Sequence, residues 1–125
     1  MARVLVADDE ASVRTVVLRA LQLDGHEIIP VADGAGALEA LEGAQFDLLL
    51  TDIVMPGLDG IALALKAAKL DPEMKIILMT GYADEQRRAH NLEALVNQVL
   101  AKPFTVAEIR RVVSQTLGNV PNDSL

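Results

Sequence analysis

Side chains that could hold a metal ion or accept a phosphoryl group follow four separate apolar runs of this 125-residue chain. They are Asp8 and Asp9, Asp52, Thr80 and Lys102. Taken singly, each has an ordinary explanation, because Asp often caps helices or fills turns and a lysine before proline is commonly an exposed turn residue. Taken together, three carboxylates repel one another and favour a hard cation such as Mg²⁺. A carboxylate nucleophile, a hydroxyl, a lysine and that cation are the groups needed to take up a phosphoryl group.

The stretch around Asp52 indicates how the chain would position this carboxylate. Residues 48–50 form a short apolar run, as expected of a strand that is buried on both faces in a parallel sheet. Pro56, Gly57 and Gly60 then predict a tight turn. Asp52 is therefore expected where its strand leaves the sheet, a place where side chains from neighbouring strand ends converge.

Strand-like and helix-like patterns alternate along the whole chain. The expected strands are residues 4–7, 28–31, 47–50, 75–80 and 96–101. The expected helices are one capped by Ser12 and ended by Asp24-Gly25, one at 35–41, one striped by Ile61, Ala64, Leu65 and Ala68, one at 84–92 and one at 106–117.

Five strands alternating with five helices predict an α/β fold, a doubly wound parallel sheet with helices on both faces. Pro30 predicts that the second strand lies at an edge of this sheet, since proline cannot donate to a neighbouring strand. Ligands of such sheets bind at the carboxyl ends of the strands. The candidate residues all follow strands and are expected to meet at that edge.

Composition limits the classes of protein that need to be considered. The length and the 51% hydrophobic content fit one domain with a real core. A formal charge of −7 argues against a sequence-independent nucleic-acid binder, which would need a basic face. No apolar run approaches the ~20 residues that span a bilayer, and cysteine is absent. We expect a soluble cytoplasmic protein that contacts neither membrane nor nucleic acid.

Four motifs together carry a family resemblance. They are Asp8-Asp9, Asp52 followed by Met55-Pro56-Gly57 and Asp59-Gly60, Thr80-Gly81, and Lys102-Pro103-Phe104. At these spacings the chain resembles a response-regulator receiver domain of the CheY-like superfamily from residue 3 to about residue 117. The resemblance implies a flavodoxin-like sheet with strand order 2-1-3-4-5 and five helices.

The resemblance also implies a role for each site residue. Asp52 would accept a phosphoryl group from a histidine kinase or a histidine phosphotransfer protein. Mg²⁺ would be held by Asp8, Asp9 and Asp52 with the backbone carbonyl of Val54. The phosphoryl oxygens would be contacted by two further residues, Thr80 and Lys102. The peptide bond before Pro103 is expected to be cis, as it is in the family.

Two positions bear on switching. Receivers often carry an aromatic residue three positions before the lysine, and here that residue is Val99. Aromatic coupling through the fifth strand is therefore not expected. Tyr82, the chain's only tyrosine, follows Thr80 by two positions and is a candidate gate or partner contact. In the family, Val54 and Tyr82 would flank the phosphoryl group and tune its hydrolysis.

The expected domain organisation is a receiver domain at residues 1–118 and a short tail at 119–125 without an output domain. The response would then come from binding an unknown downstream protein through the fourth helix, fifth strand and fifth helix. Within receivers, the chain resembles both the CpdR-type single-domain regulators of bacterial cell-cycle proteolysis and the receivers of hybrid histidine kinases. A protease complex is accordingly one candidate effector, and a monomer or weak dimer is expected.

Other classes of function fit less well. A phosphatase of the haloacid-dehalogenase type would carry Asp-x-Asp after its first strand, where this chain has Glu10 in the second position. Dinucleotide binding would need a glycine-rich turn after that strand, and none is present. Two alternatives remain open: a receiver that forms part of a hybrid kinase, and a receiver fold that binds a partner constitutively without being phosphorylated. We expect a switch, not a turnover enzyme.

Overall fold

The computed structural model of the chain describes residues 1–81, 85, 89 and 96–118. In these residues a single parallel sheet has the order β2-β1-β3-β4-β5. Its strands are β1 (Arg3–Ala7), β2 (Glu27–Val31), β3 (Leu48–Asp52), β4 (Lys75–Thr80) and β5 (Gln98–Ala101). The expected fold class and strand order are therefore confirmed, and so is the edge position of the strand that contains Pro30.

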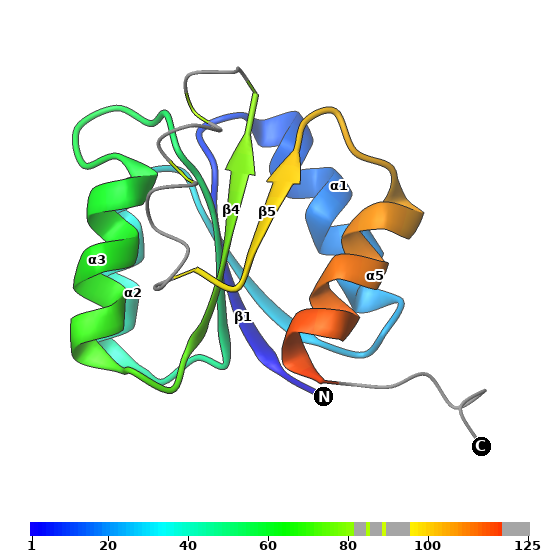
Figure 1. The fold of residues 1–125 in the computed structure, drawn as a ribbon, viewed down its shortest axis with the longest axis horizontal. Coiled ribbons are helices and arrows are strands. Elements are labelled where there is room, and N and C mark those ends of the chain that lie inside the picture. Colours follow the sequence, from blue (N-terminus) through cyan, green and yellow to red (C-terminus); the bar gives the residue numbers. More distant parts are fainter. Residues whose placement is uncertain (82–84, 86–88, 90–95, 119–125) are drawn as a thin grey trace.

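Helices cover both faces of the sheet (Figure 1). One face is covered by α2 (Gly34–Gly43) and α3 (Gly60–Leu70), and the other by α1 (Ala11–Gln22) and α5 (Val106–Leu117). The helix expected at residues 84–92 lies outside the described residues, apart from Glu85 and Ala89. Among the described residues, the helices that the structure delimits are these four.

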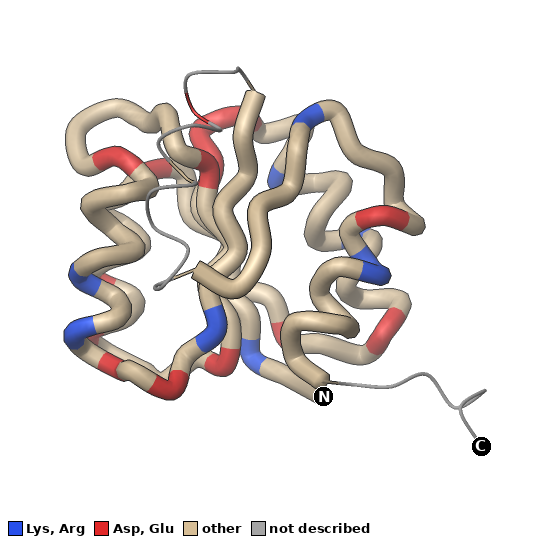
Figure 2. The backbone as a smooth tube through the Cα atoms, in the orientation of Figure 1, with Lys and Arg blue, Asp and Glu red and all other residues tan. Residues whose placement is uncertain are grey.

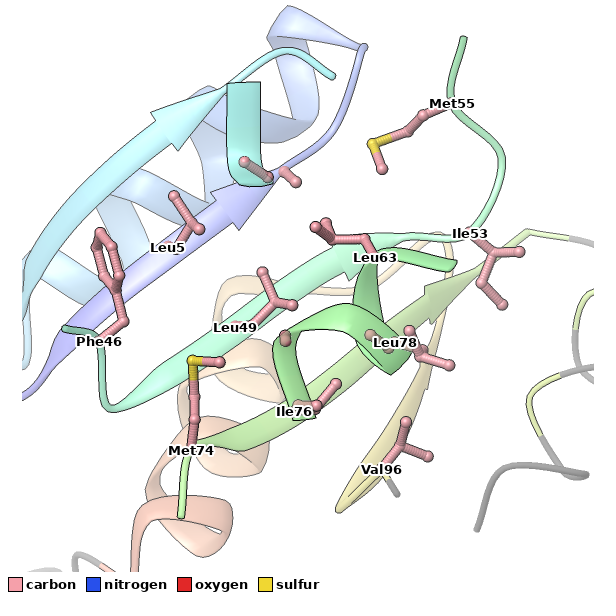
Figure 3. Close-up of a cluster of buried hydrophobic side chains, with 14 of the residues drawn as sticks. Leu5, Phe46, Leu49, Ile53, Met55, Leu63, Met74, Ile76, Leu78 and Val96 are labelled. Atoms are coloured by element: carbon pink, nitrogen blue, oxygen red, sulfur yellow. The ribbon is translucent and has the colours of Figure 1, made fainter. Parts of the chain in front are cut away.

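The core has one layer on each face of the sheet. Leu49 packs with Leu63 of α3 and Ile76 of β4 in the layer beneath α2 and α3 (Figure 3). Leu48 and Leu50 point the other way, into the layer beneath α1 and α5. Successive side chains of a strand face opposite sides, so β3 supplies both layers and all five of its residues are buried. Asp52 therefore lies at the end of a strand that is buried on both faces.

Two sequence predictions about helices were wrong. The first helix begins at Ala11 with Glu10 as its N-cap residue, two positions before the predicted cap Ser12, which lies inside the helix. On α3, Leu65 is exposed, whereas Leu63 and Ala67 are buried. The reason for the second error lies at Gly60, whose close packing against β3 fixes how α3 is rotated.

The helix α5 has a clear sequence signal at each of its ends. Thr105 Oγ1 accepts a hydrogen bond from the Glu108 N–H, and Glu108 Oε1 accepts one from the Thr105 N–H, which forms a capping box. Gly118 ends the helix in the left-handed conformation, with φ +75°. Ile109, Val112 and Val113 are buried, whereas Val106 at the start of the helix is exposed. The helices in the described part of the chain do not combine the length and the hydropathy needed to cross a membrane.

Candidate functional site

Asp52 is the last residue of β3, and its backbone surroundings hold it in place. Its Oδ1 accepts a hydrogen bond from the Ile53 N–H at 3.0 Å. After the turn, the Gly60 N–H donates to the Ile53 carbonyl at 2.8 Å, which brings the start of α3 back against the strand. A β-carbon on Gly60 would lie 1.8 Å from the Asp52 carbonyl oxygen. Only glycine fits this approach, and Gly57, with φ +73°, helps to form the turn that leads to it.

Asp8 approaches from the end of β1 and is completely buried. Its Oδ1 accepts a hydrogen bond from the Glu10 N–H at 2.9 Å, and Arg14 Nη1 donates to its backbone carbonyl at 2.6 Å. The next residue, Asp9, is exposed. Carboxylate oxygens of Asp8, Asp9 and Asp52 lie within 4.8 Å of one another. The three residues predicted to share a metal ion are thus close enough to hold one.

Lys102 reaches the same carboxylates from the end of β5. Its Nζ lies 2.9 Å from Asp8 Oδ2, 3.3 Å from Asp52 Oδ2 and 3.6 Å from Glu10 Oε1. The Lys102 N–H donates to the Thr80 carbonyl at 2.7 Å, which ties its backbone to β4. The peptide bond between Lys102 and Pro103 is cis, as expected.

The charges at this edge leave one carboxyl electrostatically strained. Burial of Asp52 and the negative charge of Asp8 raise the pKa of Asp52 from 3.8 to about 6, against the lowering effect of Lys102 and the Ile53 N–H. Burial alone would lower the pKa of Lys102, but contacts with Asp8 and Asp52 outweigh it and raise that pKa. The positive charge of Lys102 therefore only partly compensates the negative charge of the carboxylates. A bound divalent cation would compensate the rest of that charge.

A cleft of about 750 Å³ opens at this edge of the sheet. Acidic positions gather there near a basic position at the end of β5 (Figure 2). The described residues that line the cleft come from the β1–α1 connection and α1, from the ends of β3 and β5 with the residues after them, and from the chain that follows β4: Asp9, Glu10, Ser12, Val13, Val16, Asp52, Val54, Gly81, Glu85, Lys102, Pro103 and Phe104. A reacting group could therefore reach Asp52 and Lys102 from solvent.

Of the other predicted site residues, some line the cleft and others do not. Val54 lines the cleft and is 55% exposed. Thr80 is completely buried and is not among the described residues that line the cleft. Its Oγ1 has no hydrogen-bond partner in the described part of the chain. Val99 is partly exposed on β5, in register with Leu78, and does not line the cleft. Tyr82 lies outside the described residues.

Sequence reasoning did not single out three side chains that contribute here. Glu10 lies near Lys102, Arg14 supports the backbone of Asp8, and Glu85 accepts a hydrogen bond from the Gly81 N–H at 3.1 Å. Glu10 could have been suspected from its position beside the acidic pair. The other two act on backbone groups, and a backbone contact leaves no residue-type signal in one sequence.

Comparison with known proteins decides the family. Residues 4–114 match the model of the response regulator receiver domain. The chain belongs to this family. It is 37% identical to the response regulator receiver protein CpdR of Brucella abortus, over 94% of this chain and 98% of that protein. It is also 38% identical to part of the sensor kinase CckA of the same organism, which covers 93% of this chain but 12% of the kinase.

Solved structures agree with this membership. A CheY-like receiver domain protein from Methanospirillum hungatei superposes with a TM-score of 0.87, at 30% identity over 94% of each chain. A receiver domain protein from Clostridium thermocellum superposes with a TM-score of 0.85 at 24% identity, over 94% of this chain and 95% of that one, a likeness of fold. The chain is thus a receiver domain of the kind found in two-component signalling proteins.

Proposed function

We propose that this receiver is a phosphorylation-dependent switch in which Asp52 accepts a phosphoryl group from a histidine kinase or phosphotransfer protein, with Mg²⁺ as cofactor. The observation that carries the proposal is the convergence on Asp52. Lys102 Nζ lies 3.3 Å from its Oδ2, and carboxylate oxygens of Asp8 and Asp9 lie within 4.8 Å. Asp52 and Lys102 both line one cleft. Phosphoryl transfer needs positioning and charge neutralisation above all, and these groups provide both.

In the proposed transfer, one bond to phosphorus forms and another breaks. A carboxylate oxygen of Asp52 attacks the phosphorus of an N-phosphorylated histidine, and an O–P bond forms. The P–N bond breaks, its electron pair stays on the imidazole nitrogen, and that nitrogen takes a proton from solvent. Attack of water on the acyl phosphate later returns the carboxylate and inorganic phosphate. Val54 and Tyr82, by their sequence positions, would tune the access of that water.

The cation fits the donors that the chain offers. Oxygen ligands in this number suit Mg²⁺, and Asp8, Asp9, Asp52 and the Val54 carbonyl would hold it. Bound Mg²⁺ would supply positive charge against the repulsion between Asp52 and a dianionic phosphoryl group. Lys102 supplies further positive charge from the end of β5, and it is already in contact with Asp52.

The signal would leave the site through Thr80. Its buried Oγ1 is available to donate to a phosphoryl oxygen, because the described residues offer it no acceptor. A new bond there would act on β4 and on the neighbouring β5, which is joined to it by the Lys102–Thr80 backbone bond. The receiver domain, residues 1–118, would then change its affinity for a downstream protein. The expected contact face comprises the helix expected at residues 84–92 together with β5 and α5. Arg111 is exposed on α5, whereas Arg110 is committed to Asp24.

A second candidate is a receiver acting within a hybrid kinase phosphorelay, which the 38% identity to part of CckA favours. The site chemistry would be the same, and the difference would lie in the next acceptor. A phosphorylated protein that passes its phosphoryl group on to a phosphotransfer histidine supports the relay, whereas retention of the group with altered protein binding supports the switch.

The test is labelling with a small acyl phosphate donor. We expect one phosphoryl group per chain in the presence of Mg²⁺, little without the metal and none in Asp52→Asn. Labelled and unlabelled protein should then differ in which downstream protein, for example a protease complex, they retain. Normal folding without labelling, under conditions that label a known receiver, would support the alternative of a constitutive binding module.

A further inference from the structure

Glu85 is a buried carboxylate beside the site that the chemistry above does not use. It is 6% exposed. Its Oε1 accepts the hydrogen bond from the Gly81 N–H at 3.1 Å, and a β-carbon on Gly81 would lie 3.9 Å from its Oε2. Both carboxylate oxygens are therefore close to Gly81. A buried carboxylate is stabilised by such a donor, so this contact is a specific one.

Gly81 and Glu85 line the same cleft as Asp52 and Lys102. Gly81 directly follows Thr80, whose carbonyl accepts the Lys102 N–H, so the Gly81 amide is fixed to the backbone framework that also carries Lys102. Backbone N–H groups at such a position are good donors to a phosphoryl oxygen. In this structure the donor is already taken by Glu85.

We propose that Glu85 is a positioning residue that holds the Gly81 N–H in the unphosphorylated state and so opposes occupation of the site by a phosphoryl group. The inference rests on the proposed function, because it concerns regulation of the same Asp52 site. Two effects combine. Glu85 competes for the Gly81 donor, and its negative charge repels a dianionic group entering the cleft. Release of Glu85 from Gly81 is then one structural change that phosphorylation requires.

Two substitutions separate the two effects. Glu85→Gln keeps an oxygen that can accept from Gly81 while it removes the charge. Glu85→Ala removes both the charge and the acceptor. Glu42→Gln is the matched control, because Glu42 is exposed near the end of α2 and loses the same charge. Circular dichroism should verify that each variant folds, and Glu85→Gln alone decides the question if Glu85→Ala does not fold.

The readout is affinity for beryllofluoride, a phosphoryl mimic, measured with Mg²⁺ by fluorine NMR. We expect Glu85→Gln to bind it about three- to tenfold more tightly than the unmodified chain, because loss of the charge removes the repulsion and leaves a weaker, neutral hydrogen bond to Gly81. Glu85→Ala should bind at least as tightly, and Glu42→Gln should match the unmodified chain. A second readout is the Gly81 amide resonance, which should move on beryllofluoride binding and move partway in Glu85→Ala without ligand.

Unchanged or weaker binding by a folded Glu85→Gln variant would overturn the role of Glu85. Equal tightening in Glu42→Gln would also overturn it, since the effect would then reflect net charge alone. If the unmodified chain binds no beryllofluoride and takes no phosphoryl group, the proposed function itself fails. If it binds and is labelled normally while the Glu85 variants behave identically, the function stands and this inference fails.

Discussion

Lys102 Nζ lies 3.3 Å from Asp52 Oδ2 and 2.9 Å from Asp8 Oδ2, so one ammonium from the end of β5 joins carboxylates at the ends of β3 and β1. The relationship depends on the backbone as much as on the side chains. The Lys102 N–H donates to the Thr80 carbonyl at 2.7 Å, which fixes the lysine's backbone to β4. One ammonium therefore links the carboxyl ends of three strands.

Replacing Asp52 by Asn should stabilise the metal-free protein at about pH 7. The pKa of Asp52 is raised from 3.8 to about 6, so the folded chain binds this proton more tightly than the unfolded chain and ionisation costs stability as pH rises through that window. The gain should be on the order of 1–3 kcal/mol in urea unfolding with a chelator present, and should vanish near pH 4. A loss of stability at pH 7 would contradict this electrostatic description.

Removing Lys102 should have the opposite effect. Lys102→Met leaves Asp8 and Asp52 facing each other without their cation, and we expect a loss of about 1–3 kcal/mol in metal-free buffer, reduced because the site is partly hydrated. Mg²⁺ should bind the variant more tightly than the unmodified chain, because a competing positive charge is gone. Lys66→Met, on the exposed face of α3, is the control. Equal Mg²⁺ affinity in both variants would argue against a shared Lys102 and metal site.

Gly60 should tolerate no side chain. A β-carbon there would lie 1.8 Å from the Asp52 carbonyl, so Gly60→Ala must displace α3 or the end of β3. We expect a loss of about 1–3 kcal/mol or more in unfolding free energy, together with slower phosphoryl uptake. Gly43→Ala is matched to it, because Gly43 ends α2 with open space around it. That variant should be neutral or slightly stabilising, and similar losses at both positions would refute the steric argument.

His26 should give the protein a second, opposite dependence on pH. Its Nδ1 accepts a hydrogen bond from the Ala2 N–H at 3.0 Å, which requires that nitrogen to be unprotonated. Burial lowers the pKa of His26, against the raising effect of Asp24. The unfolded chain therefore takes up the proton first, and the stabilisation is complete above the ordinary value of 6.5 and is lost as pH falls below it.

NMR titration of the His26 ring checks this prediction. The midpoint should lie below 6.5, and Asp24→Asn should lower it further. His26→Gln should remove the corresponding part of the pH dependence of unfolding. A midpoint above 6.5 would contradict the description of His26 as a buried neutral acceptor.

The sequence predicted well those features that depend on a local pattern of residues, such as the strands and the polar residues at their ends. Each apolar run that became a strand ends near a polar residue, so the meeting of Asp8, Asp52 and Lys102 could be expected once the parallel sheet was inferred. The rotation of α3 could not, because Leu65 and Leu63 are equally apolar and the choice is made by the backbone contact between Gly60 and Asp52. The Glu85 contact with Gly81 was missed for a similar reason, since its donor is a backbone N–H.

The most direct test of Asp52 as the phosphoacceptor is to locate the phosphoryl group in the labelled protein. The protein is incubated with an acyl phosphate donor and Mg²⁺ and then treated with borohydride, which reduces an aspartyl phosphate to homoserine, and its peptides are sequenced by mass spectrometry. We expect homoserine at position 52 alone, dependent on both donor and Mg²⁺. Conversion at Asp8 or Asp9 instead, or no conversion in a folded protein under conditions that convert a known receiver, would contradict the assignment of Asp52 as the phosphoacceptor.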